Sequence, residues 1–284
     1  MAQSTMRDKI CVVTGATGGI GEITARALAT NGATVVLVGR NQSKAEATVA
    51  KIKRETGNEN VEYLLADLSV QKDVRRLADE FKAKYDRLHV LVNNAGAMYM
   101  KRQESADGIE LTFALNHLAY FLLTNLLLDT LKASAPARVI NVSSSAHQMG
   151  KMDWDDLQGR KKFTGMRIYG RSKLANILFT REMARRLAGS GVTVNALHPG
   201  VVTTGFGVNN GFMGQVGRKL MDFFSISAEQ GAQTTIYLAT SPEVEGVTGK
   251  YFYKQKEATP TAAAQNDADA RTLWETSEKL VGMA

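Results

Sequence analysis

Cysteine is nearly absent from this chain of 284 residues, because Cys11 is the only one. A single cysteine excludes an internal disulfide and fits a reducing compartment, so we expect a cytoplasmic protein. Cys11 lies within the apolar run ICVVT, which favours core packing over a role as nucleophile. No apolar run reaches the roughly 18 residues of a membrane span, and the start MAQSTMRDKI lacks the apolar core of a signal peptide. We therefore expect no transmembrane segment.

A concentrated basic stripe is also missing, although 35 basic and 28 acidic residues give a net charge of +7. Residues of both signs alternate in KAEATVAKIKRE and KDVRRLADEFKAK. This mixture predicts solvent-exposed helix faces with i,i+4 pairs, and no nucleic-acid partner. His117, His147 and His198 are not spaced as metal ligands, so no metal site is predicted.

Short apolar runs alternate with helical segments in a chain whose 44% hydrophobic content is typical of a globular protein. The runs predict strands at 9–14, 34–38, 62–66, 89–94, 138–143, 192–197 and 249–253. Helices are predicted at about 19–30, 43–56 and 70–84, within 107–132, from near Met166, from Ser227 and at 267–282. Apolar strands that alternate with helices predict an α/β fold, a doubly wound (Rossmann) parallel seven-stranded sheet with helices on both faces. No boundary rich in proline, glycine or serine interrupts the pattern, so we expect residues 1–284 to form a single domain.

A glycine-rich turn joins the first predicted strand to the first predicted helix in VVTGATGGIGEITARAL. Gly15 permits a tight turn, Gly19 lets the backbone approach a pyrophosphate, and Gly21 lets the helix pack against the strand. The helix N-terminus then offers free N–H groups to phosphates. Glycine-rich turns without a ligand also exist, but the position in the first βαβ unit favours dinucleotide binding.

The second predicted strand ends in LVGRN, where a chain that binds NAD usually has a carboxylate for the ribose hydroxyl. This chain has Gly39 and Arg40 instead, and a guanidinium suits a 2′-phosphate. We therefore expect NADP(H) to be favoured over NAD(H), the alternative being that Arg40 is an ordinary loop arginine. Asp67 follows the third strand, where it either accepts from an adenine amino group or caps the next helix.

Several motifs between residues 9 and 204 together resemble the short-chain dehydrogenase/reductase family. They are TGATGGIG (14–21), ADL (66–68), NNAG (93–96), LTFALNHLAYFLLT around Asn116, NVSS (141–144), YGRSK (169–173) and HPGVVTT (198–204). Within the family, SSSAHQMGKMDWDDL and LWETSEKL are most similar to the retinol-dehydrogenase-like group. The N-terminal membrane anchor of many members of that group is not seen in this sequence. Gly18 stands where relatives that prefer NADP often have a basic residue, so Arg40 alone favours that cofactor.

The resemblance implies hydride transfer between a nicotinamide and a carbonyl or alcohol, with Tyr169 as the acid/base. Lys173 lies one helical turn after Tyr169, so we expect it to lower the tyrosine pKa, and the resemblance also assigns it to the nicotinamide ribose. Ser144 is expected to hydrogen-bond the substrate oxygen. Asn116 resembles the family residue that supports a water leading to the lysine; the alternative is a hydrogen-bonded core asparagine.

The resemblance also implies further cofactor contacts, beside the glycine loop, Arg40 and Asp67. These are Thr17, Ile20, Leu68, Asn94, Ala95, Gly96, Pro199, Gly200, Val202 and Thr204. NNAG is expected mainly to brace the sheet. Val202 is expected to meet the carboxamide and Thr204 the pyrophosphate, although a Pro-Gly turn needs no ligand. Gly170, Arg171 and Ser172 are interpreted as spacers.

Residues 205–226 combine glycines with large apolar side chains and are expected to form a lid over the substrate. We therefore predict an apolar carbonyl or alcohol substrate; alternatively, these side chains pack on a partner subunit or a membrane surface. Residues 151–165, with Trp154, are expected to edge the substrate entrance. A homodimer or homotetramer is compatible with the sequence. Other function classes left open are an idle dinucleotide-binding sensor or scaffold and a family epimerase or dehydratase.

Overall fold

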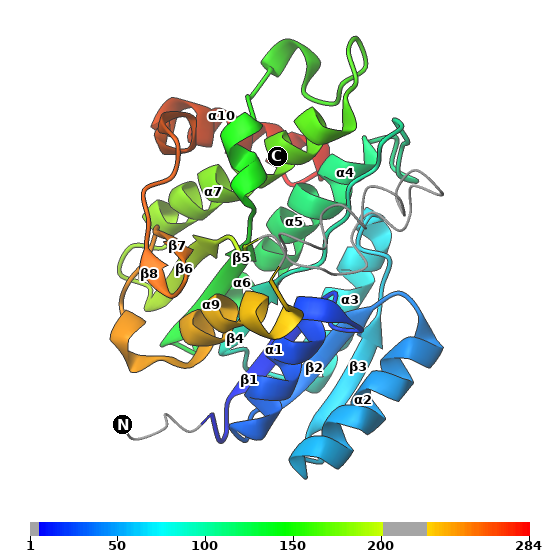
Figure 1. The fold of residues 1–284 in the computed structure, drawn as a ribbon, viewed down its shortest axis with the longest axis vertical. Coiled ribbons are helices and arrows are strands. Elements are labelled where there is room, and N and C mark those ends of the chain that lie inside the picture. Colours follow the sequence, from blue (N-terminus) through cyan, green and yellow to red (C-terminus); the bar gives the residue numbers. More distant parts are fainter. Residues whose placement is uncertain (1–5, 201–225) are drawn as a thin grey trace.

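The computed structural model describes residues 6–200 and 226–284. In these ranges one sheet runs through the molecule in the order β3-β2-β1-β4-β5-β6-β7-β8 (Figure 1). The parallel strands are β1 Ile10–Thr14, β2 Thr34–Gly39, β3 Val61–Leu65, β4 Val90–Asn93, β5 Ala137–Val142, β6 Val192–Leu197 and β7 Tyr251–Tyr253. The predicted doubly wound parallel sheet is confirmed.

An eighth strand, β8 (Lys256–Glu257), extends the sheet and runs antiparallel to β7. Lys254 and Gln255 connect the two strands and both have positive φ, of 49° and 62°. Positive φ at both central residues is typical of a type I′ hairpin turn, which usually carries Asn-Gly. The sequence lacks that signal here, and so the hairpin was not predicted.

Helices cover both faces of the sheet, as the alternation of elements predicts. Helices α1 (Gly19–Thr30), α2 (Gln42–Thr56) and α9 (Ala228–Thr240) pack on one face. Helices α3 (Gln71–Lys84), α5 (Ala119–Leu126) and α7 (Gly165–Arg186) pack on the other, and α10 (Asp267–Leu280) lies against α7 (Figure 1). Two hydrophobic clusters therefore sandwich the sheet, with Cys11 fully buried in one of them.

The long helix predicted within 107–132 is divided in the structure. It consists of α4 (Leu111–Phe113), a π-helical segment Ala114–Leu118, α5 and α6 (Leu128–Ala133). Single π turns inside helices occur frequently at functional sites. Short 3₁₀ turns lie at Ser145–Met149, Trp154–Asp156, Pro242–Val244 and Ala262–Gln265.

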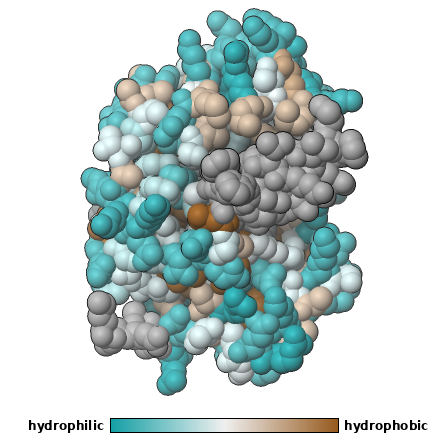
Figure 2. All heavy atoms as spheres, in the orientation of Figure 1, coloured by the Kyte–Doolittle hydropathy of each residue, from teal (hydrophilic) through white to brown (hydrophobic). Residues whose placement is uncertain are grey.

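The strand order reverses at β1, which pairs with β2 on one side and β4 on the other. In doubly wound folds, ligands bind beyond the carboxyl ends of the strands at this switch point. The surface seen in Figure 2 is dominated by hydrophilic side chains, in agreement with the mixed charges of the helices. Among the described residues, no helix combines the length and the apolar character needed to span a membrane.

Candidate active site

The glycine loop between β1 and α1 is packed against the segment that follows β4. Gly15 has a φ of +63°, and a Cβ at this position would lie 2.9 Å from Ala95 Cα. A Cβ at Gly21 would lie 2.3 Å from the carbonyl oxygen of Gly15, so a side chain there would separate the helix from the loop. The N-cap of α1, Gly18, has no side-chain capping bond. The first-turn N–H groups of α1 thus remain available to phosphates, and the loop fits a dinucleotide.

The NNAG segment is attached to the end of β1 by hydrogen bonds. The N–H groups of Asn94 and Ala95 donate to Thr14 Oγ1 at 2.8 and 3.0 Å, and Asn94 Nδ2 donates to Thr14 O at 2.8 Å. Tyr120 Oη donates to Ala95 O at 2.9 Å. These bonds brace the switch point. A Cβ at Gly96 would lie 3.1 Å from Asn116 Oδ1, so only a small residue fits beside the catalytic candidates.

Two candidates for cofactor recognition lie at the ends of β2 and β3. Arg40 directly follows β2 and is exposed, and its guanidinium makes no hydrogen bond or ion pair to residues 6–200 or 226–284. Gly39 is in contact with the glycine loop, because a Cβ there would lie 2.6 Å from Thr17 Cγ2. The carboxyl end of β2, where the cofactor ribose is expected, is therefore directly adjacent to the glycine loop.

Asp67 does not cap the helix that follows it, and that alternative is wrong. Helix α3 begins at Gln71 with Val70 as its N-cap. Asp67 Oδ1 accepts instead from Ser69 N at 3.0 Å and from Ser69 Oγ at 2.7 Å, which closes a turn ahead of the helix. The intervening turn was not apparent in the sequence. The neighbouring Leu68 is buried in the core.

The candidates that follow β6 are only partly described. Pro199 and Gly200 are the last residues of this stretch, and Gly200 N donates to His198 Nδ1 at 3.2 Å. Val202, Thr204 and the expected lid at 205–226 lie outside the described residues, except for its last residue, Ile226. Thr17 and Ile20, in the glycine loop, are half-buried.

Tyr169 and Ser144 are brought together by α7 and by the turn after β5. The Ser144 hydroxyl accepts from Ala146 N at 3.1 Å and forms a hydrogen bond with the Tyr169 side chain. Burial raises the pKa of Tyr169 to about 12, and the bond to Ser144 opposes this. The expected lowering of this pKa by Lys173 does not arise from the chain alone.

Lys173 is buried on the same face of α7 as Tyr169, with its ammonium directed at the end of β5. Its Nζ donates to Val142 O at 3.0 Å and lies 5.7 Å from the centre of the Tyr169 ring. Ser143 Oγ donates to Lys173 O at 2.7 Å. Burial lowers the pKa of Lys173 to about 7, so its charge changes near neutral pH.

Asn116 lies in the π-helical segment and links the chain after β4 to α7. Its Oδ1 accepts from Ala97 N at 2.9 Å, and its Nδ2 donates to Ala97 O at 2.9 Å and to Ser172 Oγ at 3.0 Å. Its backbone oxygen accepts from Asn176 Nδ2 at 2.9 Å. The geometry is that of a hydrogen-bonded core asparagine that also holds the segment containing Tyr169 and Lys173.

The interpretation of Gly170, Arg171 and Ser172 as spacers is wrong. A Cβ at Gly170 would lie 2.7 Å from Ala146 O, so glycine lets the turn carrying Ser144 approach α7. Ser172 Oγ donates to Tyr169 O at 2.7 Å and accepts from Asn116. The sequence could not reveal these roles, because each partner comes from a distant part of the chain.

Arg171 is 3% exposed and is bound to the segment 151–165. Its Nε donates to Lys151 O at 3.0 Å, and its Nη1 donates to the carbonyl oxygens of Asp156 and Leu157 at 2.6 and 2.7 Å. Its Nη2 lies 3.7 Å from Asp153 Oδ2. This buried guanidinium therefore anchors the extra segment to the catalytic helix.

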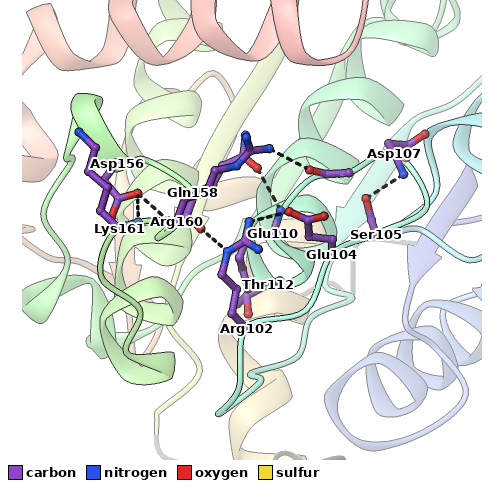
Figure 3. Close-up of polar contacts among 11 residues, drawn as sticks. Arg102, Glu104, Ser105, Asp107, Glu110, Thr112, Asp156, Gln158, Arg160 and Lys161 are labelled. Carbon is purple, nitrogen blue, oxygen red and sulfur yellow. Dashed lines mark hydrogen bonds and ion pairs between the residues drawn. The ribbon is translucent and has the colours of Figure 1, made fainter.

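The segment 151–165 is tied on its other side to residues 102–110 (Figure 3). Glu110 N donates to Gln158 Oε1 at 3.2 Å, and Arg102 Nε donates to Gln158 O at 3.3 Å. The Asp156 carboxylate accepts from the backbone N–H groups of Arg160 and Lys161, at 2.6 and 3.1 Å. These contacts hold the segment 151–165 in place beside the start of α7.

A buried polar row beneath the site was not predicted. Asn93 Nδ2 donates to Asn141 Oδ1 at 2.9 Å and to Thr124 Oγ1 at 3.0 Å. Asn141 Nδ2 donates to Thr180 Oγ1 at 2.9 Å. Asn93 and Asn141 are paired across β4 and β5, so the row joins the sheet to α5 and α7. Asparagines at adjacent strand ends were the only signal in the sequence.

Over the described residues, no three histidine, cysteine or acidic side chains are grouped as a metal site.

Comparison with known proteins agrees with this geometry. Residues 9–211 match the model of the short chain dehydrogenase family. An uncharacterised protein from Mycobacterium paratuberculosis has a similar structure, with a TM-score of 0.80, 32% identity, and coverage of 99% of this chain and 96% of that one. The RhlG/NADP complex of Pseudomonas aeruginosa has a TM-score of 0.71 at 27% identity, and the match covers 89% of this chain and 96% of that one.

Relatives of known activity match nearly the whole chain. Retinol dehydrogenase 12 of Mus musculus is 45% identical over 97% of this chain and 87% of its own length. Retinol dehydrogenase 13 of Homo sapiens is 44% identical over 99% of this chain and 87% of its own length. Polyprenol dehydrogenase of Homo sapiens is 42% identical over 97% and 86%, respectively. Since similarity at this level extends through the strands, the glycine loop and the catalytic helix alike, the chain belongs to the short-chain dehydrogenase family, as a retinol-dehydrogenase-like NAD(P)-dependent enzyme that acts on alcohols.

Proposed function

We propose that the chain uses NADP(H) to interconvert an alcohol and a carbonyl on a hydrophobic substrate, with Tyr169 as the acid/base. The observation that carries this proposal is the hydrogen bond between Tyr169 and Ser144, with Lys173 buried on the same helix face. All three groups lie where the fold family binds ligands, beyond the carboxyl ends of the parallel strands.

The proposed roles follow from the chemistry of each group. The nicotinamide, when bound, supplies or accepts the hydride. Tyr169 donates a proton to the substrate oxygen during reduction and removes it during oxidation. Ser144 holds that oxygen beside the phenol. Lys173 is proposed to contact the nicotinamide ribose. Asn116 is proposed to hold Ser172 and the backbone of Ala97 beside Tyr169 and Lys173.

Because burial raises the pKa of Tyr169, we expect reduction and oxidation to depend on pH in different ways. Burial raises the pKa to about 12, so the chain itself keeps the phenol protonated at neutral pH. A protonated phenol is the form required for reduction, whereas oxidation requires the phenolate. We therefore expect the rate of alcohol oxidation to rise with pH on the alkaline side, while carbonyl reduction proceeds at neutral pH.

The residues that we propose to hold the cofactor are those of the glycine loop, NNAG and the strand ends. Arg40 supports the preference for NADP(H), because its exposed guanidinium lies at the end of β2 and next to Thr17 through Gly39. One structural neighbour is an NADP complex. Asp67 lies at the end of β3, where we propose that the adenine is bound.

The preference for NADP(H) predicts a specific change in Arg40→Ala. Loss of the guanidinium should weaken NADPH binding by about tenfold or more, the value of one charge-assisted contact, and leave NADH binding within twofold. Titration of cofactor fluorescence with both nucleotides measures this. Lys44→Ala, a neighbouring exposed cation on α2, is the control. An unchanged ratio of NADPH to NADH affinity in Arg40→Ala would show that Arg40 does not select the cofactor.

The relatives named above act on retinol and polyprenol, which supports an apolar alcohol or carbonyl as the substrate class. We propose that the segment 205–226 covers it and that 151–165 edges its entrance. The test is consumption of NADPH with a panel of apolar aldehydes and ketones beside small polar sugars. Turnover of sugars alone would contradict the substrate class, and conversion without net NADPH consumption would point to an epimerase or dehydratase.

The role of Tyr169 predicts that Tyr169→Phe retains cofactor binding but loses turnover. Removal of a general acid/base should lower kcat by about 10²- to 10⁴-fold. Stopped-flow hydride transfer and NADPH titration measure the two properties separately. Tyr63→Phe removes an exposed tyrosine hydroxyl distant from the site and is the matched control. Full activity in Tyr169→Phe would mean that another group is the acid/base, whereas NADPH binding without turnover in the wild-type protein would favour an idle sensor.

We also propose that the protein acts in the cytoplasm. The Cys11 thiol is fully buried and burial raises its pKa to about 12, so it is an inert core side chain. With a single cysteine the chain forms no internal disulfide that an oxidising compartment would maintain, which supports this proposal. Cell fractionation with an antibody to the full chain tests this, and recovery in an oxidising compartment would contradict it.

A further inference from the structure

His147 is buried three residues after Ser144 and is bonded to it in two ways. His147 N donates to Ser144 O at 3.0 Å, and His147 Nδ1 lies 2.8 Å from the same oxygen. The other ring nitrogen, Nε2, accepts from Thr261 N at 3.5 Å. A carbonyl oxygen can only accept and a backbone N–H can only donate, so Nδ1 carries the proton. The two contacts thus select a single tautomer.

The imidazole also connects the Ser144 turn to the next strands. Its ring packs edge-on against Tyr251 of β7, with ring centres 5.2 Å apart. Tyr251 in turn stacks on His198, which stacks on Tyr253 at 4.0 Å. His198 Nδ1 accepts from Gly200 N. His147 is therefore held in place by its contacts with β7 and with Thr261. Its bonds to the Ser144 carbonyl oxygen then restrain the backbone of Ser144.

In the part of the chain that the structure describes, the Ser144 carbonyl oxygen is contacted by the N–H and the ring of His147. The Ser144 hydroxyl accepts from Ala146 N and bonds the Tyr169 side chain. A serine that must meet both a phenol and a substrate oxygen needs a fixed backbone, because a displacement of about 1 Å can cost about 10²-fold in rate. We infer that His147 is a positioning residue that holds Ser144 against Tyr169 through the bond from Nδ1 to the Ser144 carbonyl. This inference rests on the role proposed for Ser144.

Burial keeps the ring uncharged, since it lowers the pKa of His147, while the bond to Ser144 opposes this. The titratable groups packed around the ring are His198, Tyr251 and, through His198, Tyr253. A proton added at Nε2 would face the N–H of Thr261 and remove that contact. The neutral ring with hydrogen on Nδ1 is therefore the form that holds Ser144.

Two amide substitutions separate the two sides of the ring. In His147→Asn the amide nitrogen takes the place of Nδ1 and keeps a donor for Ser144 O. In His147→Gln the amide group extends toward the position of Nε2, and the donor to Ser144 is lost. We expect kcat for reduction to fall about 10- to 100-fold in His147→Gln and less than about threefold in His147→Asn, with KM for NADPH unchanged in both. Equal losses in the two variants would overturn the inference.

A third variant removes the distal contact and leaves the histidine intact. Thr261 has a φ of −59°, which proline adopts, and its hydroxyl is buried without a partner in the described structure. Thr261→Pro thus removes the N–H that faces Nε2, together with a hydroxyl that makes no hydrogen bond in the described structure. We expect a loss of less than about threefold in kcat, because the bond to Ser144 remains. A loss as large as that of His147→Gln would show that the Ser144 contact is not the one that matters.

A double-mutant cycle decides whether His147 acts through Ser144. In a Ser144→Ala background, His147→Gln should change the residual kcat by less than twofold. In the Ser144-containing enzyme, His147→Gln should also move the alkaline limb of oxidation to higher pH, because the Ser144 bond favours the phenolate. Additive losses and an unmoved pH profile would mean that the histidine is merely structural.

His89 provides the matched control for loss of a buried imidazole. It is 7% exposed and its Nδ1 accepts from Ile10 N at 3.0 Å, at the amino end of the sheet. His89→Gln should lower the melting temperature and leave kcat and its pH profile unchanged. Melting temperature and NADPH binding of every variant confirm that it is folded. If Ser144→Ala keeps full activity, the proposed function of Ser144 fails, and this outcome is distinct from failure of the cycle.

Discussion

At the scale of single residues, the site depends on polar side chains that are buried and hydrogen-bonded to one another or to the backbone. The pentapeptide YGRSK gives the clearest case, because each of its members has a separate task. Tyr169 and Lys173 face the proposed chemistry, Ser172 bonds Asn116, and Arg171 holds the segment 151–165. A buried polar group is stable only when its bonds are made, so loss of one partner costs more than the bond itself contributes.

Arg171 allows this to be tested through stability. Arg171→Met should destabilise the fold by about 2 to 4 kcal/mol, because the carbonyl oxygens of Lys151, Asp156 and Leu157 lose their donor. Urea unfolding at neutral pH measures this. Arg167→Met, an exposed arginine on the same helix, should stay within about 0.5 kcal/mol of the wild type. Equal stability of the two variants would mean that the guanidinium bonds contribute little.

The common helix face of Tyr169 and Lys173 could be predicted from their spacing, whereas Ser144, which follows β5, was assigned from its place in the family motif. The partners of Arg171 and Ser172 could not be predicted, since they lie in segments whose folding has no local signature. The same holds for the pKa of Tyr169. Lys173 lies on the expected face, but burial by the rest of the molecule raises the pKa of Tyr169, and the opposing effect comes from the bond to Ser144.

At the scale of elements, the site depends on how closely α7 approaches the turn Ser145–Met149. Glycines make this approach possible on both sides. A Cβ at Gly170 would lie 2.7 Å from Ala146 O, and one at Gly150 would lie 2.5 Å from Gly170 O. The turn carries Ser144 and the helix carries Tyr169, so the distance between the two elements sets the distance between the two side chains.

Gly170→Ala is expected to separate these elements although alanine favours a helix. The added Cβ should push the turn away and lower kcat by about tenfold or more, while helix propensity alone would stabilise the protein by up to about 1 kcal/mol. Steady-state kinetics beside thermal unfolding measures both effects. Unchanged kcat would show that the turn moves without consequence for Ser144.

Long, strongly patterned elements were predicted well at this scale, whereas irregular ones were not. Strands β1 to β7 are apolar runs, and the pattern suffices. The π-helical segment Ala114–Leu118 and the hairpin at Lys254–Gln255 have no distinct composition. Tertiary contacts determine them: Asn176 bonds the freed carbonyl of Asn116, and Gln255 N donates to Thr234 Oγ1.

At the scale of the whole molecule, the fold keeps several histidines neutral by burying them fully or in part. His117 is completely buried between α5, α7 and α10, where its ring nitrogens meet Asn176 and Ser277. Burial lowers its pKa to about 4, and that of His198 likewise to about 4. Both are well below the ordinary histidine value, so the folded state resists protonation that the unfolded chain accepts.

This difference fixes the sign of the acid dependence. Between pH 6.5 and 4 the unfolded chain binds protons at these histidines that the folded chain does not, so the free energy of unfolding falls as the pH is lowered through this window. His117 alone should contribute about 2 to 3 kcal/mol to the loss. Urea unfolding at pH 7, 5.5 and 4.5 measures it. In His117→Gln, which keeps an amide for Ser277, the protein should be less stable at pH 7 but should lose less on acidification. A slope identical to that of the wild type would assign the acid sensitivity to other groups. Lys173 acts in the same direction at higher pH: its lowered pKa makes the free energy of unfolding rise from about pH 7 toward 10.5.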